Sequence, residues 1–331
     1  MNTFIKARNL SLHYPQHSPL LRRKTNVVRA VNDINLSIIQ GESLGLVGES
    51  GCGKSTLGKT LIRFYTPTKG NIFYHPKQDK KIDIASMTQR ELKKAGIRQR
   101  FQMLLQDHST AMNPRMSIKK ILTEGIQSRN YKSEKSINEE ILSCLNQVGL
   151  NESHLQRFPH EFSGGQRQRI CIARALSIQP EFIVLDEPTS ALDVSVQAQI
   201  LLLLNDIRKK LGITYLFITH NLLILKYVCS RVVVMYLGRI VEILDVNQLF
   251  TDASHPYTLT LLKSVPDLGQ EQLSAPPKGE IPNPSSLSKG CGFYQRCSHA
   301  VSECSQVYPP LKKISSNHWI SCHKFFREQT A

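Results

Sequence analysis

The stretch GESGCGKS, Gly48–Ser55, matches the phosphate-loop pattern G-x-x-x-x-G-K-[ST]. It follows the apolar run SLGLV and precedes a segment with helical character, which is the context that the pattern requires. Glycines let backbone N–H groups face phosphate oxygens, and the start of a helix adds partial positive charge. We expect Lys54 to reach the β- and γ-phosphates and the Ser55 hydroxyl to hold Mg²⁺. The other loop residues expected to contact the nucleotide are Gly48, Ser50, Gly51, Gly53 and Thr56.

Two acidic residues, Asp186 and Glu187, end the apolar run FIVL. A carboxylate at the end of a buried strand is costly without a partner, and Mg²⁺ beside a triphosphate would supply one. We expect Asp186 to associate with Mg²⁺ and Glu187 to polarise the attacking water. A capped strand end would explain one acid, but not two acids together with a phosphate loop.

His220 ends the next apolar run, TYLFITH. In a doubly wound sheet, ligands bind at the carboxyl ends of the strands. A lone histidine of this kind is more often structural, but the phosphate loop and the acid pair share the same predicted edge. We therefore expect His220 to reach the γ-phosphate.

Four of the eight cysteines fall in the last 41 residues. They are Cys291, Cys297, Cys304 and Cys322. Their spacing lacks the short C-x₂-C pairs of a zinc ribbon, and four thiolates in a compact segment can ligate a [4Fe–4S] cluster. Structural Zn²⁺ and unligated or disulfide-linked thiols are the alternatives. His299, His318 and His323 are nearby backup ligands that we expect to lie on the solvated surface.

Elements that could position these residues follow from the periodicity of the chain. Buried strands alternate with helices, which predicts an α/β sheet with helices on both faces. A hairpin is expected around Gly238, and a helix is expected to end at Gly212. Residues 265–290 carry five prolines and read as an extended linker.

Composition sets broad limits. The chain has 331 residues, 40% of them hydrophobic and 21% charged, as in an ordinary globular protein with a core. The formal net charge of +16 invites nucleic acid, anionic lipid or nucleotide, but no RNA-binding signature accompanies it, so no nucleic-acid partner is expected. No apolar run reaches about 18 residues, and no secretory pattern is present. We expect a soluble cytoplasmic protein that could still dock on a membrane protein.

The stretch SGGQ, Ser163–Gln166, resembles the signature motif of ATP-binding-cassette (ABC) ATPases. Gln106 in LLQDH is similar to their Q-loop glutamine, Asp193 in SALD to their D-loop aspartate, and His220 to their switch histidine. Tyr14 is placed like the aromatic residue that stacks on adenine. The resemblance implies that Gln106 takes part in catalysis by sensing Mg²⁺ and that it faces a membrane subunit.

The same resemblance implies an α/β fold of the ABC-type P-loop NTPase. Such a fold has a RecA-like core, an antiparallel β subdomain and a helical subdomain, here at about residues 107–165. The cassette would cover residues 1–262, and a small cysteine-rich extension would cover residues 263–331. The resemblance also implies that two cassettes enclose two ATP molecules head to tail. The residues that would complete the partner's site are Ser163, Gly164, Gly165 and Gln166.

The resemblance narrows to the ATPases of oligopeptide and dipeptide importers. It rests on HPYT (255–258), GEIPNP (279–284), GCGFYQRC and the downstream cysteines, and on the long early segment typical of the F-type dipeptide subunit. It implies a sibling ATPase rather than a homodimer, two transmembrane permeases, and a periplasmic solute-binding protein as an indirect partner. It further implies a peripheral location on the cytoplasmic face of the bacterial inner membrane, and a [4Fe–4S] cluster on the four clustered cysteines.

Two other function classes stay open. A non-transport ABC ATPase in a soluble enzyme complex, such as one for phosphonate breakdown, would share the nucleotide motifs. A nucleic-acid ABC ATPase would explain the charge, but such proteins usually carry two cassettes or a long coiled coil, and this chain has one phosphate loop. The transported solute cannot be read from these residues.

Overall fold

The computed structural model describes residues 2–17, 24–77, 80–105, 112–129, 133–265, 282 and 289–328. The chain divides into two compact units. The first, which we call the helical unit, consists mainly of Ile39–Glu42 and Ser86–Ile218. The second, the sheet unit, consists of Thr3–Ile38, Ser43–Ala85 and Thr219–Ala331. The boundaries expected from the sequence, at about residues 107, 165 and 262, stay predictions.

Three parallel strands run through the helical unit in the order β8-β7-β6. Their bounds are Phe101–Leu104 for β6, Phe182–Asp186 for β7 and Thr214–Ile218 for β8. Phe182 pairs with Phe101 on one side and with Thr214 on the other. Every residue of β7 and β8 is buried, as expected of apolar runs in a parallel sheet that is covered on both faces. The predicted buried strands at FIVLD and TYLFI are confirmed.

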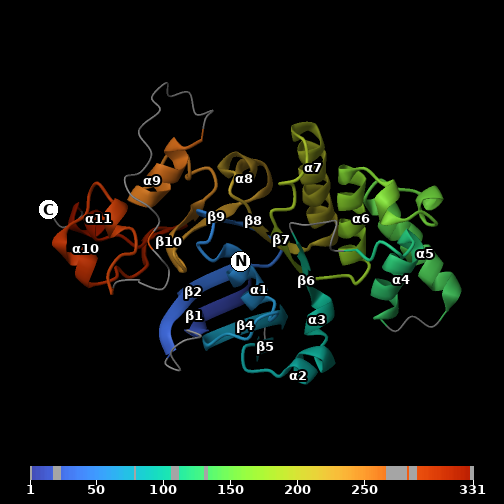
Figure 1. Cartoon of the computed structure of the whole chain (residues 1–331), viewed down its shortest axis with the longest axis horizontal. Coiled ribbons are helices and arrows are strands. Elements are labelled where there is room, and N and C mark those ends of the chain that lie inside the picture. Colours follow the sequence, from blue (N-terminus) through green and yellow to red (C-terminus); the bar gives the residue numbers. More distant parts are fainter. Residues whose placement is uncertain are drawn as a thin grey trace. The chain divides into compact units, whose positions relative to one another are not determined.

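Helices make up most of the rest of the helical unit (Figure 1). They are α2 (Gln89–Lys94), α3 (Ile97–Arg100), α4 (Ile118–Gln127), α5 (Glu134–Gln147), α6 (Gly164–Leu176) and α7 (Val194–Leu211). Helices α4, α5 and α6 pack on one another, and α6 also packs on α7. The Asp193 side chain accepts a hydrogen bond from the Val196 N–H at the start of α7. Gly212 ends that helix with φ of 66°, which confirms the prediction.

The sheet unit contains a four-stranded sheet in the order β2-β1-β4-β5. Its strands are β1 (Thr3–His17), β2 (Lys24–Ile39), β4 (Lys69–Lys77) and β5 (Lys80–Asp83). Strand β4 pairs antiparallel with both β1 and β5. The antiparallel subdomain that the family resemblance implies is therefore present.

A second set of strands in this unit runs in the order β11-β12-β10-β9-β3. The bounds are β3 (Ser43–Val47), β9 (Arg231–Tyr236), β10 (Arg239–Asp245), β11 (Lys312–Ser315) and β12 (His318–Ile320). Strands β9 and β10 form the predicted hairpin, in which Gly238 has φ of 80°. The C-terminal segment continues this sheet, because β12 pairs antiparallel with β10 through Glu242–Ile320 and Ile243–Trp319.

Short helices complete the sheet unit. They are α1 (Lys54–Leu61), α8 (Leu222–Val228), α9 (Pro256–Lys263), α10 (Ser302–Gln306), α11 (His323–Glu328) and the 3₁₀ turn η3 (Tyr294–Arg296). Phe293 and Ile320, at 2% and 0% exposure, give the C-terminal segment an apolar interior. The expectation that His318 and His323 lie on the surface is wrong, since both are buried. Each has a hydrogen-bond acceptor, the Glu242 carboxylate for His318 and the Val307 carbonyl for His323.

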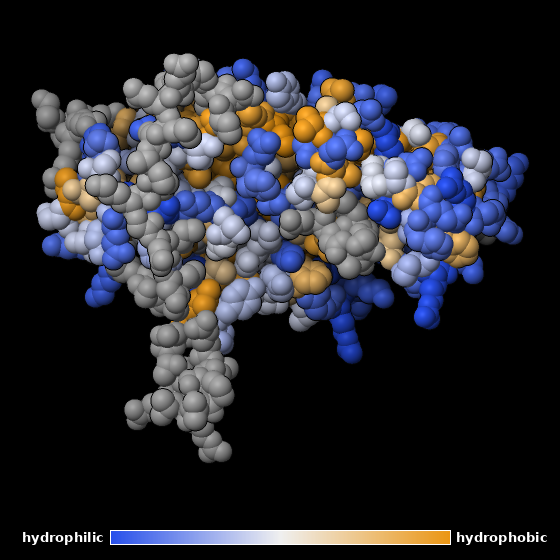
Figure 2. Space-filling model, turned by 45° about the horizontal axis from the view of Figure 1, so that its top comes forward, coloured by the Kyte–Doolittle hydropathy of each residue, from blue (hydrophilic) through white to orange (hydrophobic). Residues whose placement is uncertain are grey.

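The surface of the described residues is mainly hydrophilic on the face drawn in Figure 2, and apolar residues gather there in separate groups. Within the described residues, no helix is both long and apolar enough to cross a lipid bilayer.

Candidate nucleotide site and cysteine cavity

The phosphate loop joins β3 to α1 inside the sheet unit. Three of its glycines, Gly48, Gly51 and Gly53, have φ of 151°, 77° and 102°, values that residues with a Cβ rarely adopt. A Cβ on Gly48 would lie 2.1 Å from the Met235 carbonyl oxygen, and one on Gly53 would lie 2.0 Å from that of Ala30. Glycine is therefore required at both positions by backbone conformation and by the closeness of neighbouring chain.

Helix α1 begins directly after the loop, with Gly53 as its N-cap and no side chain capping it. Ser55 and Thr56 occupy its first turn. Because no side chain of the protein caps this helix start, its N–H groups and partial positive charge are available to an anion. The geometry suits a phosphate group.

Lys54 is buried, at 7% exposure. Its Nζ donates to the carbonyl oxygens of Gly48, at 2.7 Å, and Glu49, at 2.9 Å. The ammonium group is thus folded over the loop on which a triphosphate would lie. Burial raises the pKa of the neighbouring Cys52 thiol, so this cysteine is a poor nucleophile.

The acid pair lies in the helical unit, at the end of β7. Asp186 is buried at 7% exposure, and Glu187 follows it with φ of 48°. The Glu187 N–H donates to the Ile218 carbonyl at the end of β8, at 2.9 Å. A non-glycine residue with positive φ is uncommon and marks a position held by its surroundings. The strand end therefore turns sharply at the residue expected to orient water.

His220 and Tyr14 lie in the sheet unit, as does the phosphate loop. His220 is exposed and follows Thr219, whose N–H donates to the Leu46 carbonyl of β3 at 3.3 Å. That bond places His220 just beyond the strand that leads into the phosphate loop. Tyr14 is 38% exposed and meets the Tyr65 ring edge-on, with centroids 6.1 Å apart. Gln106 lies outside the described residues.

The signature residues begin α6 in the helical unit. Ser163 Oγ accepts from the Gln166 N–H at 3.3 Å, and Gln166 Oε1 accepts from the Ser163 N–H at 3.1 Å, which forms a capping box. A Cβ on Gly165 would lie 2.5 Å from Val196 Cγ1 in α7, so these two helix starts are close together. Hydrogen bonds from the Val196 N–H and the Ser195 hydroxyl lower the pKa of Asp193.

The structure thus groups the expected nucleotide residues in two sets. The phosphate loop, Tyr14 and His220 belong to the sheet unit, and the remaining described residues belong to the helical unit. The latter are Ser163, Gly164, Gly165, Gln166, Asp186, Glu187 and Asp193.

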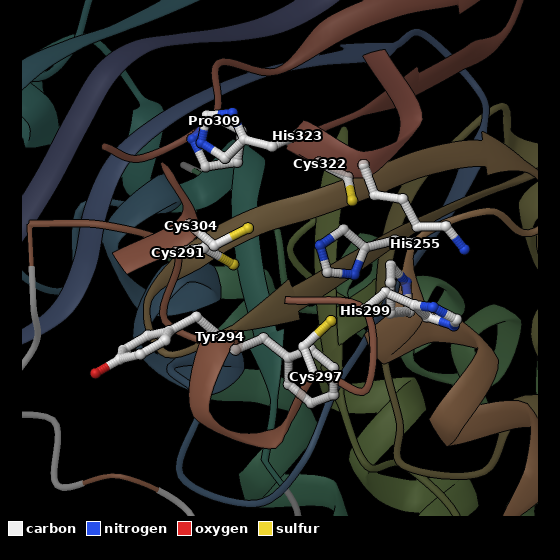
Figure 3. A pocket seen from close by; sticks show the side chains of 12 residues that line it. His255, Cys291, Tyr294, Cys297, His299, Cys304, Pro309, Cys322 and His323 are labelled. Carbon is white, nitrogen blue, oxygen red and sulfur yellow. The ribbon is translucent and has the colours of Figure 1, made fainter. Parts of the chain in front are cut away.

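All four clustered cysteines line one small cavity in the sheet unit (Figure 3). The cavity has a volume of about 20 Å³. The Cys291 N–H donates to the Cys304 carbonyl at 2.7 Å, which draws the two segments together. Burial raises the pKa of Cys291 to about 12 and also raises those of Cys297 and Cys322, and the neighbouring thiols add to each shift. Among the described residues, no three metal-ligating side chains converge as the ligands of a single ion do.

His255 also lines this cavity, and its part in it was not predicted from the sequence. Its Nδ1 accepts from the Tyr257 N–H at 3.0 Å, while Nε2 has no well-formed hydrogen bond to the described residues. Burial lowers the pKa of His255 to about 4, against opposing effects of Glu242 and the Ser321 backbone. The ring is therefore neutral at pH 7. Because Nδ1 accepts, Nε2 carries the proton.

Glu242 of β10 is a second buried residue that sequence reasoning missed. Burial alone would raise its pKa, but hydrogen bonds from His318 and Ser254 lower it below its usual value. His318 Nε2 lies 2.8 Å from the carboxylate, and the Ser254 N–H donates to it at 2.8 Å. Glu242 thus joins β12 to the chain that leads into α9. The alternating pattern of β10 gave no signal for it, because its partners are distant in sequence.

Two family descriptions match the chain. "ABC transporter" matches residues 31–190, and "Oligopeptide/dipeptide transporter, C-terminal region" matches residues 241–304. The first range holds the phosphate loop, the signature residues and the acid pair. The second includes His255 and three of the four clustered cysteines.

Characterised relatives cover nearly the whole chain. The oligopeptide transport ATP-binding protein AppF of Bacillus subtilis is 41% identical over 329 residues, 98% of each chain. The putative oligopeptide transport ATP-binding protein YkfD of the same organism is 42% identical over 93% of each chain.

Solved structures match the cassette. A dimeric, post-hydrolysis form of the ATP-binding cassette MJ0796 bound to ADP and phosphate is 26% identical, with a TM-score of 0.63. The match covers 73% of this chain and 98% of that one. The protein cbiO1 from Clostridium perfringens, part of an ABC transporter complex, is 25% identical with a TM-score of 0.63, over 76% of this chain and 92% of that one. The chain has the ABC ATPase fold and belongs to the ABC transporter family, among its oligopeptide and dipeptide transport ATP-binding proteins.

Proposed function

We propose that this chain is the ATP-hydrolysing subunit of an ABC importer for oligopeptides, dipeptides or similar small solutes. The observation that carries this proposal is the 41% identity to an oligopeptide transport ATP-binding protein over 98% of the chain. The match of residues 241–304 to a transporter C-terminal region favours import over a role in a soluble enzyme complex.

The nucleotide is bound first by the phosphate loop. Lys54 exchanges its bonds to the Gly48 and Glu49 carbonyls for bonds to the β- and γ-phosphates, while the start of α1 contributes N–H donors. Tyr14 stacks on the adenine ring. Its half-exposed ring in the same unit as the loop supports this role.

Hydrolysis depends on the residues at the ends of β7 and β8. Ser55, Asp186 and Gln106 are proposed to hold Mg²⁺, and the hydroxyl, carboxylate and amide oxygens of this set suit a hard cation. When bound, Mg²⁺ neutralises charge on the phosphate oxygens. Glu187 orients and polarises the attacking water, and His220 contacts the γ-phosphate.

The signature residues act on the nucleotide of a partner cassette. The start of α6 at Ser163–Gln166 would close over the partner's triphosphate, with Asp193 beside it, so ATP would join two cassettes and hydrolysis would separate them. We propose a sibling ATPase as this partner, two transmembrane permeases, and a location on the cytoplasmic face of the membrane. A solute-binding protein would take part indirectly.

Reconstitution tests this function. The full chain would be assembled with its sibling and permeases in proteoliposomes, and ATP hydrolysis and uptake of a labelled dipeptide and a labelled pentapeptide would be measured. We expect ATP-dependent uptake that is lost in the Glu187→Gln assembly. ATP hydrolysis that never couples to uptake of either peptide would contradict the import function.

We also propose a [4Fe–4S] cluster at Cys291, Cys297, Cys304 and Cys322. A donor set of four thiols around one cavity suits such a cluster, and the His255 Nε2 proton in the same cavity is a donor suited to a sulfur. A single Zn²⁺ would draw each thiolate to about 2.3 Å from one point, a convergence absent among the described residues. A cavity of about 20 Å³ has room for one water-sized group, so the thiols must separate further to admit a cluster. When bound, the cluster would tie the segment together.

Metal analysis decides this point. After anaerobic purification, about four irons and four acid-labile sulfides per chain, with broad visible absorbance, would support the cluster. Substitution of all four cysteines by serine should remove both elements, whereas Cys144→Ser, which alters a buried cysteine far along the chain, should leave them in place. One zinc without sulfide, or no metal at all, would refute it.

A further inference from the structure

The C-terminal segment makes an ion pair with the phosphate loop. Arg296 Nη1 lies 2.8 Å from Glu49 Oε2, and Arg296 Nη2 lies 2.9 Å from Glu49 Oε1. The guanidinium group therefore binds both carboxylate oxygens at once, the geometry that gives strong and directional pairs. The Arg296 side chain is 6% exposed and that of Glu49 is 21% exposed, so solvent screens the pair only weakly.

The loop backbone is held by the same cluster of side chains. The Glu49 N–H donates to Tyr257 Oη at 2.8 Å, and Arg296 Nη1 also donates to Tyr236 Oη at 3.3 Å. The rings of Tyr236, Tyr257 and Phe293 pack together, with centroids 4.5 to 5.4 Å apart. Arg296 is thus fixed by packing on the sheet unit and is not a mobile surface charge.

Glu49 is the second residue of the phosphate loop and would sit close to a bound triphosphate. Its carbonyl accepts a hydrogen bond from Lys54 Nζ, the group proposed to contact the phosphates. A free carboxylate at this position would repel the phosphate charges, and it would also compete for the lysine. The pair with Arg296 neutralises that carboxylate and holds it away from Lys54.

We propose that Arg296 is a positioning residue for the phosphate loop, through which the cysteine-bearing C-terminal segment sets the affinity of the chain for ATP. Arg296 ends the turn η3 and directly precedes Cys297, which lines the cysteine cavity. The ATP affinity of the cassette therefore depends on the fold of a segment almost 250 residues further along the chain. This inference rests on the proposed nucleotide-binding function.

The test is a double-mutant cycle on the full-length chain, with the dissociation constant of Mg-ATP measured by isothermal titration calorimetry. We expect Arg296→Gln to weaken ATP binding about 10-fold, since a desolvated charge partner is removed. Glu49→Gln should stay within about 3-fold of wild type, and the Arg296→Gln/Glu49→Gln double variant should return to that level. Arg296→Lys should fall between wild type and Arg296→Gln, since it keeps the charge but loses the fork.

Two substitutions in the same segment serve as controls. Gln295→Ala changes an exposed residue of the same turn, and Lys313→Gln removes one positive charge from an exposed position of β11. Both should bind ATP as wild type does. An Arg296→Gln variant within 2-fold of wild type would overturn the proposal. So would a double variant as weak as Arg296→Gln, because the arginine would then serve only to fold the segment. Failure of the wild-type chain itself to bind ATP would refute the nucleotide-binding function instead.

Discussion

Two helix starts in this protein carry glycine-rich sequences, and they differ in how their N–H groups are used. At α1, the N-cap is Gly53 in a left-handed conformation, and no side chain caps the helix. At α6, Ser163 and Gln166 cap one another's N–H groups. The glycines of the first loop have positive φ and approach carbonyl oxygens, whereas Gly164 and Gly165 have no positive φ.

The difference indicates two kinds of anion site. The phosphate loop is shaped before nucleotide arrives, so its backbone is preorganised for a phosphate. The signature turn already satisfies part of its hydrogen bonding and is stable without a ligand. A site of the second kind would contribute little to ATP binding by a single cassette and would act when a second cassette presents its nucleotide. The four predictions below test that distinction.

Replacing Lys54 should have the largest effect. We expect Lys54→Ala to abolish detectable ATP binding, since each charge-assisted hydrogen bond contributes about 1.5–3 kcal/mol and at least two are lost. Equilibrium dialysis with labelled ATP would measure this. Lys59→Ala, at the other end of α1, is the matched control and should bind normally. Normal affinity in Lys54→Ala would remove the phosphate loop from the nucleotide site.

Glu187→Gln should separate hydrolysis from binding. We expect ATP affinity close to wild type but turnover lowered about 10²- to 10⁴-fold, the usual contribution of a positioned general base. Phosphate release by the assembled importer would measure turnover, and size-exclusion chromatography with ATP would show the cassette dimer accumulating. Glu181→Gln changes a half-exposed carboxylate paired with Arg100 and should leave turnover unchanged. Unaltered turnover in Glu187→Gln would place the water-orienting role elsewhere.

The same substitution at the two glycine-rich turns should have unequal consequences for folding. A Cβ on Gly48 meets a carbonyl oxygen at 2.1 Å with φ of 151°, so Gly48→Ala should lower the free energy of unfolding by about 2 kcal/mol or more. A Cβ on Gly164 finds its nearest neighbour at 3.4 Å, and Gly164→Ala should change stability by less than about 1 kcal/mol. Urea unfolding followed by circular dichroism would compare them. Equal losses would mean that the two turns are equally constrained.

Ser163→Ala should give the smallest change in the isolated chain. Loss of the cap should cost about 1 kcal/mol of stability, and ATP affinity of the single chain should not change. In the assembled importer, ATP hydrolysis should fall, because the signature turn is proposed to act on the partner's nucleotide. Weakened ATP binding by the isolated Ser163→Ala chain would contradict the distinction between the two sites.

Much of the fold could be predicted because its signals are local. The apolar runs at β3, β7 and β8, the left-handed glycine that ends α7, and the hairpin around Gly238 all depend on residues close together in sequence. The phosphate loop was equally readable, since its glycines and lysine act within one turn of chain.

Contacts between distant segments could not be predicted in this way. The Glu49–Arg296 pair and the Glu242–His318 pair join residues 247 and 76 positions apart, and neither leaves a periodic pattern. The low apolar content of the C-terminal segment suggested little core of its own. The structure shows how it is nonetheless packed, through β12 on β10 and through Phe293 among the tyrosines.

The pairing of β12 with β10 has one more consequence. Strand β10 is almost wholly buried, and without a neighbour its backbone would offer a row of unpaired groups to another molecule. The C-terminal strands occupy that row, and the sheet then finishes at β11, a short strand that carries Lys312 and Lys313. Lysines on a short outer strand discourage further pairing. The cysteine-bearing segment therefore also acts as a guard against aggregation, whatever its cavity holds.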